Sequence, residues 1–386
     1  MAAPNIDRRR AEFPTSVSGI HLLSHSLGPV PRSARDSLLA YYQAWEQHTS
    51  EDAWAARWWE LSRQVGDRIA RILGGAPGSV QIQPNASIAL ASVASCFDFA
   101  STKRNKVVTS ALDFPSMEYI WQAQRTLGAT VEIVGSPESI TIPLENILAA
   151  IDDTTSLVAM SHTSFRSSYR VDAKAIVERA HRVGARVLLD VYQSAGTIEL
   201  DANGWGIDFL IGGTIKWLCG GPACGYLYVR PDLQRDLQPR LTGWVAHDAP
   251  FDFAPSPMRY ARSVRRFAQG TPSIPALYSA LPGLQIIEEV GLETIARESR
   301  RRTESMIEFG LEQGWTINSP RDANDRGGSV MIGVADGPAM VDRLAERKVF
   351  VDCRPGVGLR ISPHFFNTDE EVEEAMIILS QLINPL

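Results

Sequence analysis

The sequence predicts an α/β protein, with a large domain built on a mostly parallel, helix-covered sheet and a smaller α+β C-terminal domain. First, short apolar runs alternate with amphipathic stretches between about residues 80 and 240. Second, two helical stretches, three short strands and a last helix follow Pro275. Third, 386 residues with 44% apolar side chains can fill a sizeable core and two or three domains.

The N-terminal region is expected to contribute one strand and a helical region before the main sheet. Residues 21–29 indicate a strand that runs into a Gly-Pro turn. Residues 32–72 have a helical pattern rich in tryptophan, and the glycines within 74–78 end it. The aromatic side chains of this region are expected in the core or in a subunit interface.

The alternating region contains seven candidate strands, most of them separated by amphipathic helices. The strands are expected at 79–83, 106–109, 130–134, 156–160, 186–190, 207–212 and 225–229, and helices, for example, at 86–97, 116–127 and 172–183. Residues 231–272, rich in Pro, Arg and aromatic side chains, indicate a long functional loop region. Further helices are expected at 276–290, 292–313 and 369–383.

Charge and cysteine content exclude several classes of function. The net charge of −6 gives no reason to expect a nucleic acid or an anionic membrane as a partner. The four cysteines show no paired Cys-x-x-Cys spacing, so we expect reduced thiols and no metal site. Without a signal-peptide pattern or an apolar run long enough for a membrane span, we expect a soluble, cytoplasmic protein.

A lysine and an acid, each at the end of a predicted strand, are the candidate catalytic residues. Asp190 ends the apolar run 187–190, and Lys216 follows the apolar-to-glycine run 209–215, 26 residues further on. Both side chains therefore fall at strand carboxyl ends, where open α/β sheets bind ligands. A buried ammonium is costly unless its charge is neutralised or used. A Schiff-base lysine beside an acid that pairs with a pyridinium nitrogen meets this requirement, and this arrangement predicts pyridoxal 5′-phosphate (PLP) as cofactor.

Other segments of the sequence could bind the phosphate group and the ring of PLP. A phosphate group favours backbone N–H groups at a helix N-terminus, and Asn85, Ala86 and Ser87 lie where a strand turns into a helix. Ser87 could alternatively be only the helix N-cap, because capping and phosphate binding use the same geometry. Phe114 follows another strand and is a candidate to stack on the cofactor ring.

Seven motifs occur in the same order as in one known enzyme family. The resemblance spans nearly the whole chain, from about Leu22. The motifs are His25-Ser26-Leu27-Gly28-Pro29, Phe114-Pro115-Ser116, Asp190-x-x-Gln193-Ser194-x-Gly196, Lys216-Trp217-Leu218-x-Gly220-Gly221-Pro222, Gly243-Trp244-x-x-His247, Arg266-Phe267-x-x-Gly270-Thr271 and the stretch from Arg354 to Arg360. The chain resembles the class V aminotransferase family of fold-type-I PLP-dependent enzymes, and within it most resembles kynureninase.

The resemblance implies a role for each matching residue toward the cofactor. Lys216 and Asp190 are the catalytic pair: Lys216 forms the Schiff base and shuttles protons, while Asp190 keeps the pyridine nitrogen protonated. Gln193 contacts the ring oxygen. The implied cofactor-binding set is Asn85, Ala86, Ser87, Phe114, Ser164, Asp190, Gln193, Thr214, Lys216 and Thr271.

The resemblance also implies substrate contacts and a second subunit. Arg360 is expected to grip the substrate α-carboxylate through a bidentate fork, with a structural salt bridge to an acid of the small domain as the alternative. Trp244 and His247 are expected near the substrate side chain, although Trp244 could simply pack in its loop. Thr271 is expected to reach the cofactor phosphate across the two-fold axis of a homodimer.

Two departures from the family pattern bear on the reaction. Kynureninases have an aspartate where Met117 stands and a tyrosine where Ile215 stands. A cysteine desulfurase is disfavoured because residues 324–329 lack the mobile cysteine of that branch, and Cys353 is expected to be packed in a strand. A dehydrogenase is disfavoured because no Gly-x-Gly-x-x-Gly follows the first strand.

The leading hypothesis is therefore a PLP-dependent enzyme that cleaves an α-amino acid at Cβ through a quinonoid intermediate, as kynureninase does. Transamination by a class V aminotransferase is the alternative, because both reactions use the same residues. A non-catalytic binding module would be expected to lose Lys216 or Asp190. The expected domains are an N-terminal segment over 1–55, which packs on the small domain and the dimer interface, a large domain over 56–255 and a small domain over 256–386.

Overall fold

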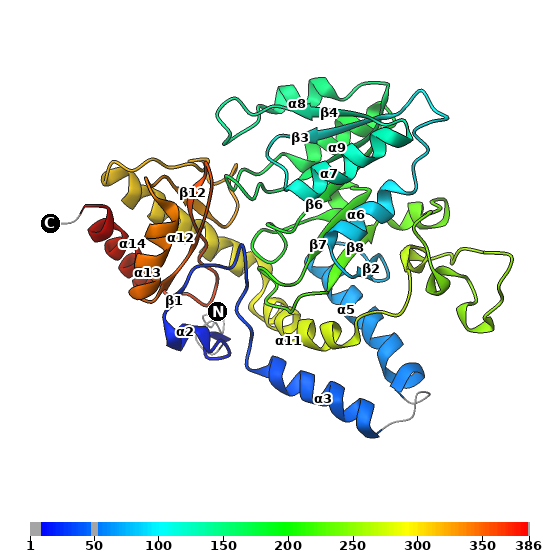
Figure 1. Ribbon diagram of the computed structural model, residues 1–386, viewed down its shortest axis with the longest axis horizontal. Coiled ribbons are helices and arrows are strands. Elements are labelled where there is room, and N and C mark those ends of the chain that lie inside the picture. Colours follow the sequence, from blue (N-terminus) through cyan, green and yellow to red (C-terminus); the bar gives the residue numbers. More distant parts are fainter. Residues whose placement is uncertain (1–8, 48–52, 385–386) are drawn as a thin grey trace.

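A computed structural model of the chain describes residues 9–47 and 53–384. Its centre is a seven-stranded sheet with the strand order β2-β8-β7-β6-β5-β3-β4 (Figure 1). The strands from β4 to β7 pair in parallel, whereas β8 pairs antiparallel with both β7 and β2. Their bounds are β2 Val80–Gln83, β3 Lys106–Ser110, β4 Thr130–Val134, β5 Thr155–Ser161, β6 Arg186–Asp190, β7 Phe209–Gly213 and β8 Gly225–Val229.

Helices cover both faces of this sheet, because successive strand residues are buried on opposite sides. On β6, Val187 and Leu189 pack into one apolar core, and Leu188 packs into the other. The first core includes α5 (Trp59–Ile72), α8 (Leu144–Ala150), α9 (Ala173–Arg182) and α11 (Ile274–Val290), and the second includes α6 (Ala86–Ala94) and α7 (Pro115–Gln124). The short helix α10 (Ala202–Trp205) precedes β7.

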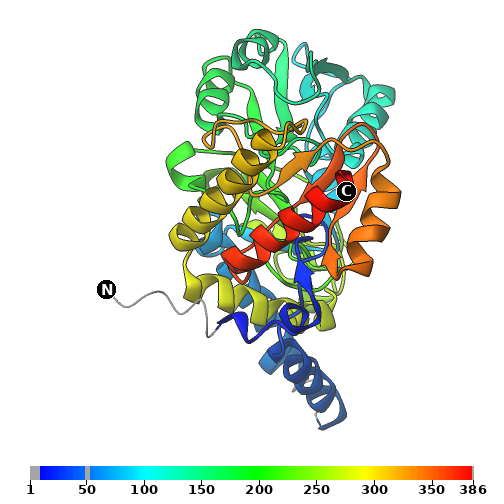
Figure 2. The same ribbon diagram turned by 90° about the vertical axis from the view of Figure 1, so that its left-hand side faces the viewer.

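The C-terminal region forms a separate layered unit with its own core. Its antiparallel sheet has the order β11-β12-β9, with β9 at Val330–Ile332, β11 at Asp352–Arg354 and β12 at Gly358–Ile361. The helices are α12 (Leu292–Glu312), α13 (Gly337–Glu346) and α14 (Asp369–Ile383), and Figure 2 shows α12 and α14 side by side on its outer face. A capping box between Thr368 and Glu371 fixes the start of α14.

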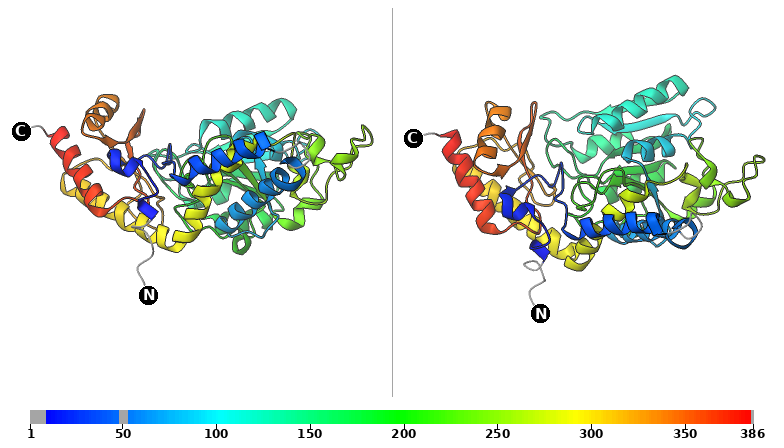
Figure 3. Two further views of the ribbon diagram at one scale, coloured as in Figure 1. Left: turned by 90° about the horizontal axis from the view of Figure 1, so that it is seen from below. Right: turned by 60° about the horizontal axis from the view of Figure 1, so that its bottom comes forward.

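The N-terminal segment joins this unit to the large sheet. Strand β1 (Ile20–His21) pairs in parallel with β10 (Val349–Phe350). Helix α3 (Ser33–Gln47) then lies along α11 in both views of Figure 3. The three-layer architecture and the smaller α+β unit confirm the predicted fold class.

Some element predictions are wrong in detail. The strand expected over 21–29 is limited to β1, because Leu23 and the following residues form a turn. The helical region expected over 32–72 is divided: α3 ends at Gln47, a five-residue π-helix covers Trp54–Trp58, and α5 follows. Residues 48–52 lie outside the described residues. Helix α13 was not predicted.

The limits between the domains remain a prediction, with one point of packing to add. Helix α11 falls inside the small domain predicted over 256–386, but its buried residues Leu277 and Leu284 belong to the same core as Ile69 of α5 and Val187 of β6. This packing favours a boundary after Val290, at the start of α12.

The described residues contain neither a membrane-spanning helix nor a group of side chains suited to a metal ion. None of the helices in residues 9–47 and 53–384 is both long and apolar enough to cross a bilayer. The same residues contain no cluster of three or more His, Cys, Asp or Glu side chains that could hold a metal ion.

A close backbone contact ties the N-terminal segment to the loop after β7. The Gly28 N–H donates to the carbonyl of Ile215 at 2.8 Å, and a Cβ added at Gly28 would stand 1.9 Å from the Lys216 carbonyl oxygen. Only glycine fits here without moving one of the two segments.

We therefore predict that Gly28→Ala lowers the free energy of unfolding by about 1–3 kcal/mol, as overpacking of backbone against backbone does. Gly135→Ala is the matched control, because nothing lies within 4 Å of a Cβ built there. Urea denaturation of both variants measures the effect. Equal stability of the two variants would contradict the constraint at Gly28.

Candidate active site

The ends of β6 and β7 bring Asp190 and Lys216 together. Asp190, the last residue of β6, pairs in parallel register with Ile211 of β7, and Lys216 stands three residues beyond the end of β7. The turn that holds Lys216 is fixed by backbone hydrogen bonds from Thr214 N–H to the Cys224 carbonyl at 3.1 Å and from Cys219 N–H to the Lys216 carbonyl at 3.0 Å. The lysine is therefore presented from a fixed turn.

Both side chains line a cavity of about 260 Å³. It also contains five of the other predicted cofactor contacts: Asn85, Ala86, Ser87, Phe114 and Gln193. The remaining lining residues are Leu90, Ser116, Met117, Ser161, Thr163, Phe165, Tyr192 and Ile211. Residues from three strand ends and two helix starts thus converge on one small space.

Burial tunes both charges in this cavity. Burial lowers the pKa of Lys216 to about 8, although the neighbouring Asp190 carboxylate opposes the change. Burial likewise raises the pKa of Asp190 above its usual range, against the Tyr192 N–H, which donates to Asp190 Oδ1 at 2.8 Å. A lysine with such a pKa has a substantial neutral fraction near neutral pH, as a nucleophilic amine requires.

The start of α6 suits a phosphate group. The Asn85 side chain is the N-cap and accepts from the Ile88 N–H at 2.9 Å, so Ser87 is not the N-cap but lies in the first turn. Gly225 of β8 supports this turn closely, since a Cβ there would stand 2.6 Å from Asn85 backbone atoms. A positive helix end with a nearby hydroxyl is a favourable phosphate site.

Two further side chains, Phe114 and Gln193, could contact the ring of PLP. Phe114, at the N-cap of α7, is 46% exposed, and its ring centroid lies 6.0 Å from Lys216 Nζ. Gln193 donates from Nε2 to the His25 carbonyl at 3.0 Å and accepts from Trp217 Nε1 at 3.1 Å. These bonds fix the orientation of the amide and leave one of its N–H groups for a ring oxygen. The residues present fit the cofactor.

The structure gives no support to two predicted cofactor contacts. Ser164 and Thr214 are absent from the described residues that line the cavity. Ser164 Oγ donates to the Leu112 carbonyl at 3.1 Å, and Thr214 Oγ1 donates to the Gly221 carbonyl at 3.0 Å. Both hydroxyls stabilise their own loops instead, and Ser161 and Thr163 supply hydroxyls to the cavity.

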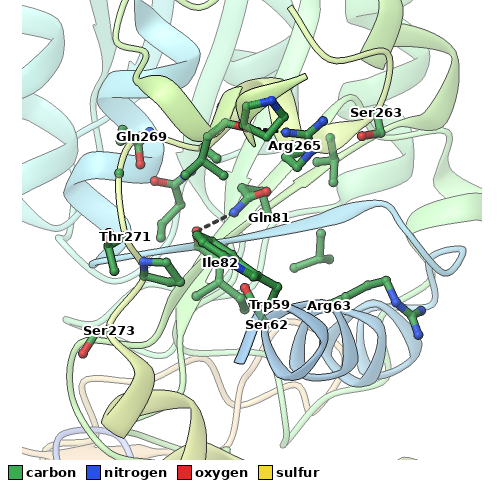
Figure 4. Close-up of a pocket in the computed structure, with 18 of the residues that line it drawn as sticks. Trp59, Ser62, Arg63, Gln81, Ile82, Ser263, Arg265, Gln269, Thr271 and Ser273 are labelled. Carbon is green, nitrogen blue, oxygen red and sulfur yellow. Dashed lines mark hydrogen bonds between the residues drawn. The ribbon is translucent and has the colours of Figure 1, made fainter. Parts of the chain in front are cut away.

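Thr271 and Trp244 lie in a second, larger cavity of about 700 Å³ (Figure 4). Trp59 and Arg265 also line it, as do Gln83 and Pro84, which directly precede Asn85 of the first cavity in the sequence. His247 is buried in the loop, with Nδ1 accepting from the Ala249 N–H at 3.1 Å. None of Thr271, Trp244 and His247 is among the described residues that line the cavity of Lys216 within the single chain.

Arg360 forms the ion pair with an acid of the small domain that the sequence indicated as the alternative to substrate binding. Its guanidinium forms a two-point ion pair with Asp352, at 2.8 Å from Nε and 2.5 Å from Nη2, and Nη1 donates to the Phe165 carbonyl at 3.2 Å. The charge of Arg360 is therefore compensated within the chain, so burial alone does not require a substrate anion. Its positive charge still acts on Lys216.

Sequence reasoning missed the aromatic neighbour of the lysine. Lys216 Nζ lies 4.3 Å from the ring centroid of Tyr192, close enough for a cation–π contact. The available signal was a tyrosine two residues after the acid that ends β6. Met117 is buried, with its sulfur near Trp121 Nε1 at 3.4 Å, and so adds an apolar wall.

Comparisons with known proteins agree with this geometry. The family model "Aminotransferase class-V" matches residues 20–374. The chain is 32% identical to "Uncharacterized aminotransferase YcbU" of Bacillus subtilis, with 96% of each chain covered. It is 30% identical to kynureninase of Pseudomonas fluorescens, covering 97% of this chain and 92% of that protein.

Solved structures show the same fold. A cysteine desulfurase from Thermococcus onnurineus matches with a TM-score of 0.88 at 21% identity over all of both chains. A C-DES variant with glycine covalently linked to its PLP cofactor matches with a TM-score of 0.86 at 19% identity, over 96% of this chain and 98% of that one. With the matched family model and the lysine–aspartate cavity, these findings identify the chain as a PLP-dependent enzyme of fold type I that belongs to the class V aminotransferase family.

Proposed function

We propose that this enzyme acts on an α-amino acid and cleaves it at Cβ, in the manner of kynureninase. The observation that carries the proposal is the cavity in which Lys216, Asp190 and Phe114 meet, with Arg360 close enough to affect the pKa of the lysine. The similarity to a kynureninase over nearly the full length of both chains supports this reaction.

Each residue of the cavity has a defined task in this proposal. PLP, when bound, supplies an electron sink for the negative charge that develops at the substrate Cα. Lys216 would hold the cofactor covalently and, as a free amine, would accept the Cα proton. Its lowered pKa suits this task, because an amine with a pKa of about 8 can both take and return a proton near neutral pH.

The other residues orient and polarise the reacting groups. Asp190 holds the proton on the pyridine nitrogen, and Gln193 donates its free N–H to the ring oxygen. Asn85, Ala86 and Ser87 bind the phosphate at the start of α6, and Phe114 covers the ring. Arg360 binds the substrate α-carboxylate, which places the bonds at Cα and Cβ beside Lys216.

Transamination is the second candidate, and two observations favour it. The relative with 32% identity bears the name of an aminotransferase. Met117 and Ile215 also replace the aspartate and the tyrosine of kynureninases, and Met117 forms an apolar wall of the cavity. In transamination, Lys216 would return the proton to the cofactor, and no bond at Cβ would be cleaved.

Product analysis separates the two reactions. PLP-loaded enzyme is incubated with a panel of amino acids that includes kynurenine, with Lys216→Ala as the inactive control. Cleavage at Cβ predicts alanine or pyruvate and no accumulation of pyridoxamine phosphate. A keto acid formed in equal amount with pyridoxamine phosphate would replace the cleavage proposal by transamination.

The covalent link predicts a label at one lysine. Borohydride reduction of the yellow, PLP-loaded protein should add the mass of the reduced cofactor to the peptide that contains Lys216, as mass spectrometry can detect. Lys106 serves as an internal control, because it is also buried but pairs with Glu132 and Asp152 at 2.9 and 2.8 Å. A label on another lysine would disprove the assignment.

We also propose that the enzyme is a homodimer whose active sites are completed across the two-fold axis. Thr271 is exposed and lines the second cavity (Figure 4). Several large apolar side chains are exposed on the same loop region and on α3, more than an isolated surface favours. They include Phe251 at 58%, Phe253 at 72%, Tyr42 at 55% and Trp45 at 61% exposure.

Hybrid dimers test this arrangement. Lys216→Ala and Thr271→Val proteins, each of low activity alone, are co-expressed with different tags and purified together. If Thr271 serves the partner's site, about half of the dimers are hybrids with one intact site, and roughly a quarter of wild-type activity returns. No recovery in isolated hybrids, or full activity of a monomer by light scattering, would contradict the shared site.

A further inference from the structure

The two-point ion pair of Arg360 lies next to the cofactor cavity in the fold. Asp352 on β11 stands directly opposite Arg360 on β12 in the antiparallel register. Arg360 is only 3% exposed, and Phe165, whose carbonyl it contacts, lines the cavity of Lys216. The pair is therefore largely removed from water and close to the reacting groups.

The ion pair leaves some N–H groups of Arg360 without a hydrogen-bond acceptor among the described residues. A guanidinium has five N–H groups. Asp352 takes Nε–H and one N–H of Nη2, and the Phe165 carbonyl takes one N–H of Nη1. One N–H remains on each terminal nitrogen, which is the number that a second carboxylate needs for two-point binding. Asp352 thus neutralises Arg360 without using all of its binding capacity.

A histidine holds Asp352 from the other side. His25 is buried, with Nε2 2.9 Å from Asp352 Oδ1 and Nδ1 2.5 Å from Ser362 Oγ. Burial lowers the pKa of His25 to about 4, so the ring is neutral at pH 7. Because a carboxylate only accepts, Nε2 carries the proton and donates to Asp352. Nδ1 then faces the Ser362 hydroxyl as an acceptor, and this hydroxyl also contacts the Leu22 carbonyl at 3.0 Å.

The same histidine connects this cluster to the cofactor cavity. Its carbonyl accepts from Gln193 Nε2 at 3.0 Å, and Gln193 lines the cavity. Although burial raises it, hydrogen bonds from His25 and Arg360 keep the pKa of Asp352 below its usual range. The carboxylate stays charged: Oδ1 accepts from His25 and Arg360, and Oδ2 accepts from Arg360 and lies 3.1 Å from Arg354 Nη1. These contacts restrict the orientation of the Arg360 side chain.

We propose that Asp352, held by His25, is a positioning residue that orients Arg360 for the α-carboxylate of the substrate, so that the site selects amino acids over the corresponding amines. This inference rests on the proposed role of Arg360. A salt bridge that only stabilises the small domain would not need a buried histidine that also bonds a cavity residue. The Arg301–Asp369 pair of the same domain is of this simpler kind, with both side chains about half exposed.

Asp352→Asn tests the proposal, with Asp369→Asn as the matched control that weakens the exposed pair. Two substrates are compared: the best α-amino acid of the panel and the amine that lacks its carboxyl group. We expect Asp352→Asn to raise KM for the amino acid on the order of tenfold, with little change in kcat or in KM for the amine. Asp369→Asn should change neither KM.

Direct binding gives a readout that does not depend on turnover. The carboxylic acid that lacks the amino group of the same substrate is titrated into PLP-loaded protein by calorimetry. Its dissociation constant should rise on the order of tenfold in Asp352→Asn, and by less in His25→Ala, which removes only the support. If Asp352→Asn fails to fold, His25→Ala alone must still weaken the acid more than the amine.

Each failure has a distinct signature. If Arg360→Lys leaves binding of the carboxylic acid unchanged, the proposed role of Arg360 is wrong. If Arg360→Lys weakens binding of the acid but Asp352→Asn does not, only the positioning role is wrong. If Asp352→Asn raises KM for the amino acid and the amine equally, the ion pair serves the fold and the inference is overturned.

Discussion

The burial of the Lys216 amine is the constraint on which the rest of the site depends. A buried ammonium is unfavourable, and burial accordingly lowers the pKa of Lys216. Asp190 opposes the cost but is itself destabilised by burial. Exposure to water would relieve the cost of burial for both side chains. The backbone at the ends of β6 and β7 must therefore hold them in the cavity. Glycine at position 28 and the hydrogen bonds of the turn keep this backbone rigid.

The N-terminal segment connects the turn that holds Lys216 to the small domain. Within a few residues it pairs with β10, donates from Gly28 to the turn of the lysine, and places His25 between Asp352 and Gln193. A movement of the small domain relative to the large sheet would have to disturb these contacts. The cofactor side and the substrate side of the site are therefore coupled through residues 20–28.

The fold and the cofactor side of the site could be predicted because each signal is local. Buried apolar runs define the strands, and Asp190, Lys216 and Ser87 follow from their places at strand ends and at a helix start. The substrate side could not be predicted in the same way. The partner of Arg360 depends on the pairing of β11 with β12, and the hydroxyls of Ser164 and Thr214 depend on loop carbonyls that no sequence pattern reveals.

The role of Thr271 is a different kind of limit, because in the proposed dimer its contact belongs to a second chain. The cavity of Lys216 is small, about 260 Å³, and Asp190 is the one acid among the described residues that line it. With Met117 as an apolar wall, this cavity supplies Lys216 and the neighbouring Tyr192 as proton-carrying groups close to Cα. The proposed contacts to the substrate side chain and to the phosphate lie instead along the second cavity, which Trp244 and Thr271 line. In the proposed dimer a second chain would cover that cavity, and its residues there would then help to decide between cleavage and transamination.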